Sequence, residues 1–67
     1  MPQNDVQHAV NQAWDYIQRR VNKGERAPLG TAAWREAVQA VDAAAQRGDV
    51  VATQAACRAW WALLFSP

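Results

Sequence analysis

Two breaks constrain the fold of this 67-residue chain more than any other feature of its sequence. The first is GERAPLG, residues 24–30, in which Pro28 lacks a backbone N–H and biases Ala27 away from helical geometry. The second is Gly48 followed by Asp49, a residue that stops helices beside one that caps them. The breaks leave three short segments, and each is expected to form one element of secondary structure.

Each of the first two segments carries an apolar stripe, with an apolar residue at every third or fourth position, which is typical of an amphipathic helix. These positions are Val6, Val10, Ala13, Ile17 and Val21 in the first segment, and Trp34, Ala37, Val38, Val41, Ala44 and Ala45 in the second. Asn4 and Thr31 are suitable caps for the two helices. The pattern predicts helices over residues 5–23, 31–47 and 50–65, with a tight hairpin between the second and the third.

Three amphipathic helices of this size bury their stripes by packing on one another, so the predicted fold is all-α, a small three-helix bundle. Hydrophobic residues make up 51% of the chain and charged residues 19%, which is a globular composition. We expect one helical domain over residues 1–67, either a whole protein or the N-terminal domain of a longer one. Large aromatic side chains suit a small core, and we expect Trp14, Trp34 and one of Trp60 and Trp61 at its centre.

The run AWWALLF, residues 59–65, is apolar all round, although a helix at the surface of a small protein needs only one apolar side. Neighbouring helical side chains point ~100° apart, so Trp60 and Trp61 do not both fit one small core. One sector of the helix packs inward, and the other needs cover from the N-terminus and the first loop, or from a second chain. The residues predicted to form a protein interface are Trp60, Trp61, Leu64 and Phe65.

Seven Lys and Arg residues against six Asp and Glu give a formal net charge of +1, so the overall charge attracts neither nucleic acid nor an anionic membrane. One local cluster of cations consists of Arg19, Arg20, Lys23 and Arg26, to which Arg58 of the third helix could add. Cations at the end of a helix also oppose the negative pole of its dipole, which is the simpler explanation of the cluster. Nucleic-acid binding through these residues is the alternative to a protein interface.

The sequence offers little material for catalysis. His8 is the only histidine, and no nucleophile or third group is placed beside it. Cys57 lies among alanines and is expected to be a small packing residue. There is no glycine-rich phosphate loop and no pair of catalytic carboxylates. We therefore predict a protein that is not an enzyme, with no cofactor, no metal and no small-molecule ligand.

A single cysteine excludes an internal disulfide and favours a reducing compartment. The segment MPQNDVQHAV lacks the cationic and apolar regions of a signal peptide, and the apolar run is far shorter than the ~20 residues that cross a bilayer. We expect a cytoplasmic protein that does not enter a membrane. Its predicted function is that of a non-catalytic interaction module, which binds a different protein or pairs with itself as a homodimer.

Overall fold

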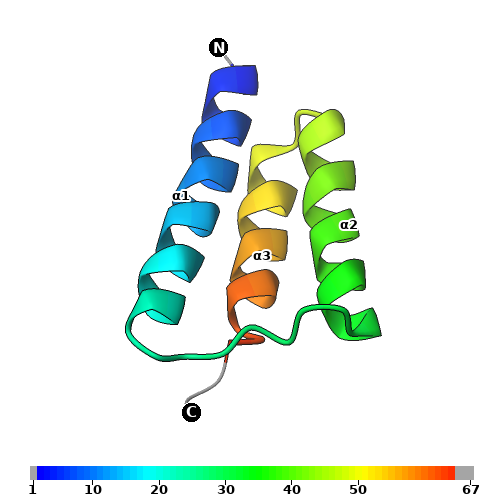
Figure 1. Cartoon of the computed structure of the whole chain (residues 1–67). Helices are drawn as coiled ribbons and strands as arrows, with labels where there is room; N and C mark the ends of the chain where they lie inside the picture. Colours follow the sequence, from blue (N-terminus) through cyan, green and yellow to red (C-terminus); the bar gives the residue numbers. More distant parts are fainter. Residues whose placement is uncertain (1, 65–67) are drawn as a thin grey trace.

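A computed structural model describes residues 2–64 of the chain, and its side chains from Asp5 to Leu64. Helix α1 spans Pro2–Asn22, α2 spans Ala32–Gln46 and α3 spans Val50–Trp61 (Figure 1). The helices pack against one another, which confirms the predicted all-α three-helix bundle. None of the three is long and apolar enough to cross a membrane.

Two of the helix starts are capped by side chains that the sequence predicts. The hydroxyl of Thr31 accepts a hydrogen bond from the backbone N–H of Trp34 at 3.2 Å, and the carboxylate of Asp49 accepts one from the N–H of Ala52 at 3.0 Å. Each cap satisfies a backbone donor that has no partner within its helix. The prediction for Asn4 is wrong, because α1 begins at Pro2 and Asn4 lies inside the helix.

The predicted end of the third helix at residue 65 is wrong as well. After Trp61 the backbone hydrogen bonds span three residues instead of four. The N–H of Leu63 donates to the carbonyl of Trp60 and the N–H of Leu64 donates to the carbonyl of Trp61, both at 3.1 Å. Bonds over three residues tighten the last turn and end the helix without a glycine. Phe65 lies outside the described residues.

Both α1 and α2 end in a Schellman motif, the two-bond arrangement that glycine permits at a helix terminus. At the end of α1 the N–H of Gly24 donates to the carbonyl of Val21 at 3.0 Å, and the N–H of Glu25 donates to that of Arg20 at 3.1 Å. The φ angle of Gly24 is 106°, in the range that residues with a Cβ rarely adopt. The same pair of bonds forms around Gly48, whose φ is 70°. The motif therefore brings Glu25 back onto the last turn of α1.

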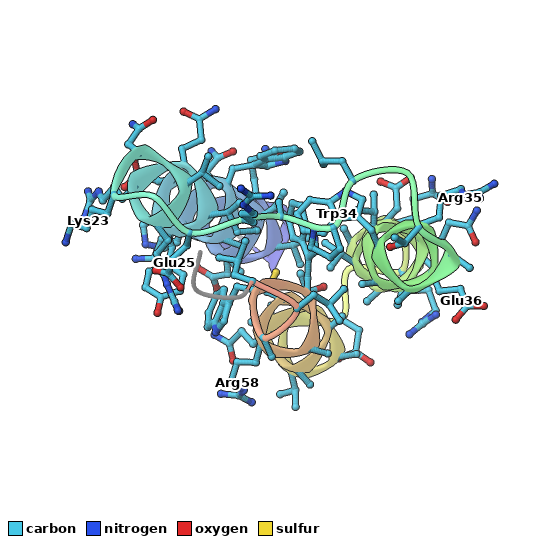
Figure 2. All side chains as sticks on the ribbon, turned by 60° about the horizontal axis from the view of Figure 1, so that its bottom comes forward. Lys23, Glu25, Trp34, Arg35, Glu36 and Arg58 are labelled. Atoms are coloured by element: carbon cyan, nitrogen blue, oxygen red, sulfur yellow. The ribbon has the colours of Figure 1, made fainter. Side chains whose placement is uncertain are left out.

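Helix α3 is the central helix of the bundle. It packs against both α1 and α2, whereas α1 and α2 touch each other only slightly. Figure 2 shows the three helices nearly end on, with α3 beside both of the others and the loop of residues 23–31 crossing from α1 to α2. A helix between two others needs apolar side chains over most of its circumference, which explains the unusual composition of α3.

The hydrophobic core lies between α3 and the apolar stripes of α1 and α2 that face it. Its buried side chains, none more than 8% exposed, are Val6, Ala13, Ile17, Trp34, Val41, Ala44, Thr53, Cys57, Trp60 and Leu64. The hydroxyl of Thr53 donates to the carbonyl of Asp49 at 2.7 Å, so this buried polar group keeps a hydrogen bond. The predicted helical stripes of the first two segments are largely confirmed, because only Val21 is exposed among them.

The tryptophans divide between core and surface. Trp34 and Trp60 are buried as predicted, and Trp60 is the member of the pair that faces the core. The prediction for Trp14 is wrong, since its side chain is 47% exposed. The reason is that α1 and α2 barely touch, so a side chain on α1 that points toward α2 is covered on one side only.

Candidate protein-interaction groove

Two of the four residues that the sequence predicts as an interface are buried. Trp60 and Leu64 are 1% and 8% exposed and belong to the hydrophobic core. Trp61 is half-buried, and Phe65 lies outside the described residues. Trp60 and Leu64 are therefore inaccessible to a partner while the bundle is folded, because the core would have to open to present them.

Trp61 packs against α1 and is half-buried there. Its ring packs at an angle of 61° on that of Tyr16, with 5.1 Å between the ring centroids. Arg20 fixes Tyr16 by donating a hydrogen bond to its hydroxyl at 2.7 Å and by placing its guanidinium carbon 5.2 Å from the ring centroid. The last aromatic side chain of α3 thus packs under a side chain of α1 that is itself held in place.

Arg20 also binds Glu25, and two nitrogens of its guanidinium contact the two carboxylate oxygens. The Schellman motif at the end of α1 creates this pair, because it normally brings the side chains at these two positions into contact. The hydrogen bonds from Arg20 lower the pKa of Glu25 below its ordinary value. Those same bonds raise the pKa of Arg20 further above its already high value.

The five cations of the nucleic-acid alternative are Arg19, Arg20, Lys23, Arg26 and Arg58, and two of them form ion pairs within the chain. Arg19 pairs with Asp15 at 2.6 Å, and Arg20 is held by its carboxylate partner as described above. Lys23 follows α1 and Arg58 belongs to α3, and their side chains extend in different directions in Figure 2. Two of the four cations at the end of α1 are thus already paired with carboxylates, which reduces the positive charge available to phosphate groups.

A groove lies between α1, the first loop and α2. It has a volume of about 630 Å³ and its walls are mainly apolar. The apolar lining consists of Trp14, Ile17 and Val21 of α1, Ala27 and Leu29 of the loop, and Trp34 of α2. Gln18, Asn22, Glu25 and Arg26 form its polar rim. The groove exists because α1 and α2 both pack against α3 and make few contacts with each other, which leaves the space between them open.

Leu29 is the most prominent side chain of the groove, with 71% of its surface exposed. It stands at the apex of a turn in which the N–H of Thr31 donates to the carbonyl of Pro28 at 3.3 Å. Gly30, the residue after Leu29, has a φ of 82°, the value that a type II turn requires there. The hydroxyl of Thr31 donates a further bond to the Pro28 carbonyl at 2.7 Å. The turn therefore presents Leu29 to solvent in a fixed position.

Aromatic packing supports the floor of the groove. Trp60 lies beneath it and contacts both Trp34 and Trp14, with ring centroids 5.6 Å and 4.8 Å apart. The indole N–H of Trp60 is buried and has no hydrogen-bond partner among the described residues. The rings of Trp14 and Trp34 pack on Trp60 edge to face, which is a favourable arrangement of aromatic rings. Trp34 extends from α2 into the space between the helices (Figure 2).

A second and smaller hollow, of about 280 Å³, lies between α1 and α3 and includes Asp5, His8 and Arg58. The residues that the structure describes contain no group of three or more His, Cys, Asp or Glu side chains that could hold a metal ion. Cys57 is 1% exposed, and burial raises the pKa of its thiol. Its sulfur lies 3.8 Å from the carbonyl oxygen of Ala9, as expected for a packing residue.

The groove and its exposed residues Trp14 and Leu29 were not predicted from the sequence. Part of the signal for Leu29 was present, because a glycine at the third position favours a type II turn, and the residue before it then lies at the apex. An apolar side chain at such a place is exposed unless another element covers it. For Trp14 there was no comparable signal, because its exposure depends on how far apart two helices pack.

Comparisons of this chain with protein-family models, with curated proteins and with solved structures gave no match. The function of the groove is therefore inferred from its own geometry and chemistry.

Proposed function

We propose that this chain is a non-catalytic helical interaction module and that it binds a protein partner in the groove between α1 and α2. One observation carries the proposal: Trp14, Val21 and Leu29 are exposed by 47%, 41% and 71%, and all three line this groove. They are three of the five large hydrophobic side chains that are exposed in the described part of the chain. Exposed apolar side chains gathered around one hollow mark a binding surface more often than scattered ones do.

The groove is also organised before any partner arrives. Leu29 stands on a hydrogen-bonded turn, and Trp14 packs edge to face on the buried ring of Trp60. Ordering flexible side chains at an interface costs ~0.5–1.5 kcal/mol for each one, and rigid groups reduce that cost. Tryptophan in particular is enriched among the residues that dominate binding energies.

The binding surface proposed here differs from the one that the sequence predicts, although the C-terminal apolar run still contributes to it. Trp60 supports the groove from inside the core, and no partner has to contact it directly. The groove has few groups suited to catalysis, because Glu25 is bound by Arg20 and Arg26 is the other charged residue in the lining. A module of this kind suits the cytoplasm, where Cys57 stays a thiol.

Site-specific photo-crosslinking in the native cells tests the proposal. A photoreactive amino acid at position 29 is expected to give defined protein adducts. The same group at position 51 serves as the control, since Val51 is 74% exposed and is not part of the groove. The substitution Val21→Asp should remove the adducts formed from position 29, because it places a carboxylate in the apolar wall. The proposal is overturned if position 29 gives no adduct, or gives the same adducts as position 51.

A further inference from the structure

We infer that the partner in the groove is a second copy of this chain, bound about a two-fold axis so that Leu29 of each copy enters the groove of the other. The inference rests on the proposed function, since it names the occupant of the surface proposed there. Two properties of the groove support it. The first is that a projecting apolar side chain and a hollow lie on the same face, and the second is that the polar groups of the rim can pair with the same groups of a second copy.

A two-fold interface requires one patch to supply both the projecting group and the cavity that receives it. The groove provides both, since Leu29 is 71% exposed at the apex of its turn and borders a hollow of about 630 Å³. The hollow is walled by Trp14 and Val21, which are exposed by 47% and 41%. In the two-fold arrangement each Leu29 is covered by the indole and the valine of the other copy, so one contact buries every large apolar side chain that the groove exposes.

The polar groups of the rim can satisfy one another across such an axis. Gln18 and Asn22 are one helical turn apart, and their amides both donate and accept hydrogen bonds, so they pair well with further amides. Glu25 and Arg26 place one negative and one positive charge in the lining. Arg20 binds both oxygens of Glu25, but a carboxylate has about four acceptor positions, which leaves room for Arg26 of the second copy.

The charge distribution favours a second copy over a strongly charged partner. The lining carries one charge of each sign, Glu25 and Arg26, so a two-fold copy can place its Arg26 beside the Glu25 that Arg20 already binds, whereas a strongly charged partner would meet a like charge. The whole chain has a formal net charge of only +1, so two copies repel each other weakly. The contact should therefore persist in high salt, because burial of apolar surface rather than charge attraction drives it.

Light scattering of the purified chain, from low micromolar to millimolar concentration and at low and high salt, tests the inference. The expected result is a mean molar mass that rises with concentration to twice the mass of one chain, at both salt concentrations. In Leu29→Asp this increase should be lost, since the substitution places two carboxylates against apolar walls. In Val51→Asp, the same chemical change at an exposed site outside the groove, the increase should remain. Leu29→Met, which keeps the volume and the apolar character, should weaken pairing by less than about tenfold.

The variants also locate the contact. Leu29 is exposed and has no role in the core, so Leu29→Asp should retain the helical circular-dichroism spectrum of the parent chain. A chain that stays monomeric at every concentration would overturn the inference, and so would a dimer that survives Leu29→Asp. Either result would leave the proposed function in place if position 29 still crosslinks to a different protein. Loss of those adducts as well would overturn both.

Discussion

The indole rings of Trp14 and Trp60 meet edge to face, with centroids 4.8 Å apart and ring planes at 89°. Trp60 is 1% exposed and Trp14 is 47% exposed, so this single contact joins the centre of the core to the wall of the groove. Packing that fixes Trp60 therefore also positions Trp14. The stability of the bundle and the shape of its candidate binding surface depend on the same residue.

Trp60→Ala should be one of the most destabilising substitutions in the chain. It removes the largest fully buried side chain and leaves a cavity, which typically costs ~3–5 kcal/mol, a large share of the total stability of a small domain. Trp61→Ala should cost clearly less, because Trp61 is only half-buried against Tyr16. Urea unfolding followed by circular dichroism measures both free energies. Equal losses, or a larger loss for Trp61→Ala, would show that the assignment of the core is wrong.

The ion pair between Glu25 and Arg20 should make stability depend on pH in the acid range. Since the pKa of Glu25 is lowered in the folded chain, the pair stabilises the fold above the pKa of an unfolded glutamate, and this contribution is lost as the pH falls through the folded pKa. The melting temperature of Glu25→Gln should therefore be lower than that of the parent chain near neutral pH and approach it on acidification. A difference that does not change with pH would contradict the assigned pair.

Cys57 should be unreactive in the folded chain, because its side chain is buried and burial raises the pKa of its thiol. A maleimide reagent near neutral pH is expected to label it slowly in buffer and rapidly in urea. Val51→Cys in a Cys57→Ala background provides the exposed control and should react at once, since Val51 is 74% exposed. Rapid labelling of Cys57 without denaturant would mean that α1 does not cover α3 as described.

The two capping side chains allow stability and pairing to be separated. Thr31→Ala and Asp49→Ala each remove a helix cap and should each cost ~0.5–2 kcal/mol of the free energy of unfolding. Thr31 also closes the turn that presents Leu29, through its bond to the Pro28 carbonyl. Only Thr31→Ala should therefore weaken self-association, which sedimentation equilibrium can measure. Equal weakening by Asp49→Ala would indicate that pairing follows overall stability and not the geometry of the turn.

Much of the fold could be predicted from the sequence because its determinants are local. Apolar spacing located the helices, the Thr31 and Asp49 caps set two of their starts, and Gly24 and Gly48 marked where two of them end. The errors at Asn4 and at the end of α3 are errors at helix boundaries, where several residues compete to begin or end a helix.

The site could not be predicted in the same way, because it depends on the order of the helices in space. The spacing of apolar residues shows which face of a helix is buried, but it does not show which helix lies in the middle. The structure places α3 there, so the extra apolar sector of the run around Trp61 faces α1 and is covered by Tyr16. The space left open instead lies between α1 and α2, where Trp14 is exposed.

Contact is proposed to occur through the α1–α2 groove and not through the C-terminal apolar run. Two-dimensional NMR of the tryptophan indole N–H groups, recorded as the protein concentration rises, tests it most directly, because each of the four indoles gives its own signal. The Trp14 signal is expected to shift with concentration, while the Trp61 signal is expected to stay constant. A spectrum in which Trp61 shifts and Trp14 stays constant would contradict the claim and return the contact surface to the end of the chain.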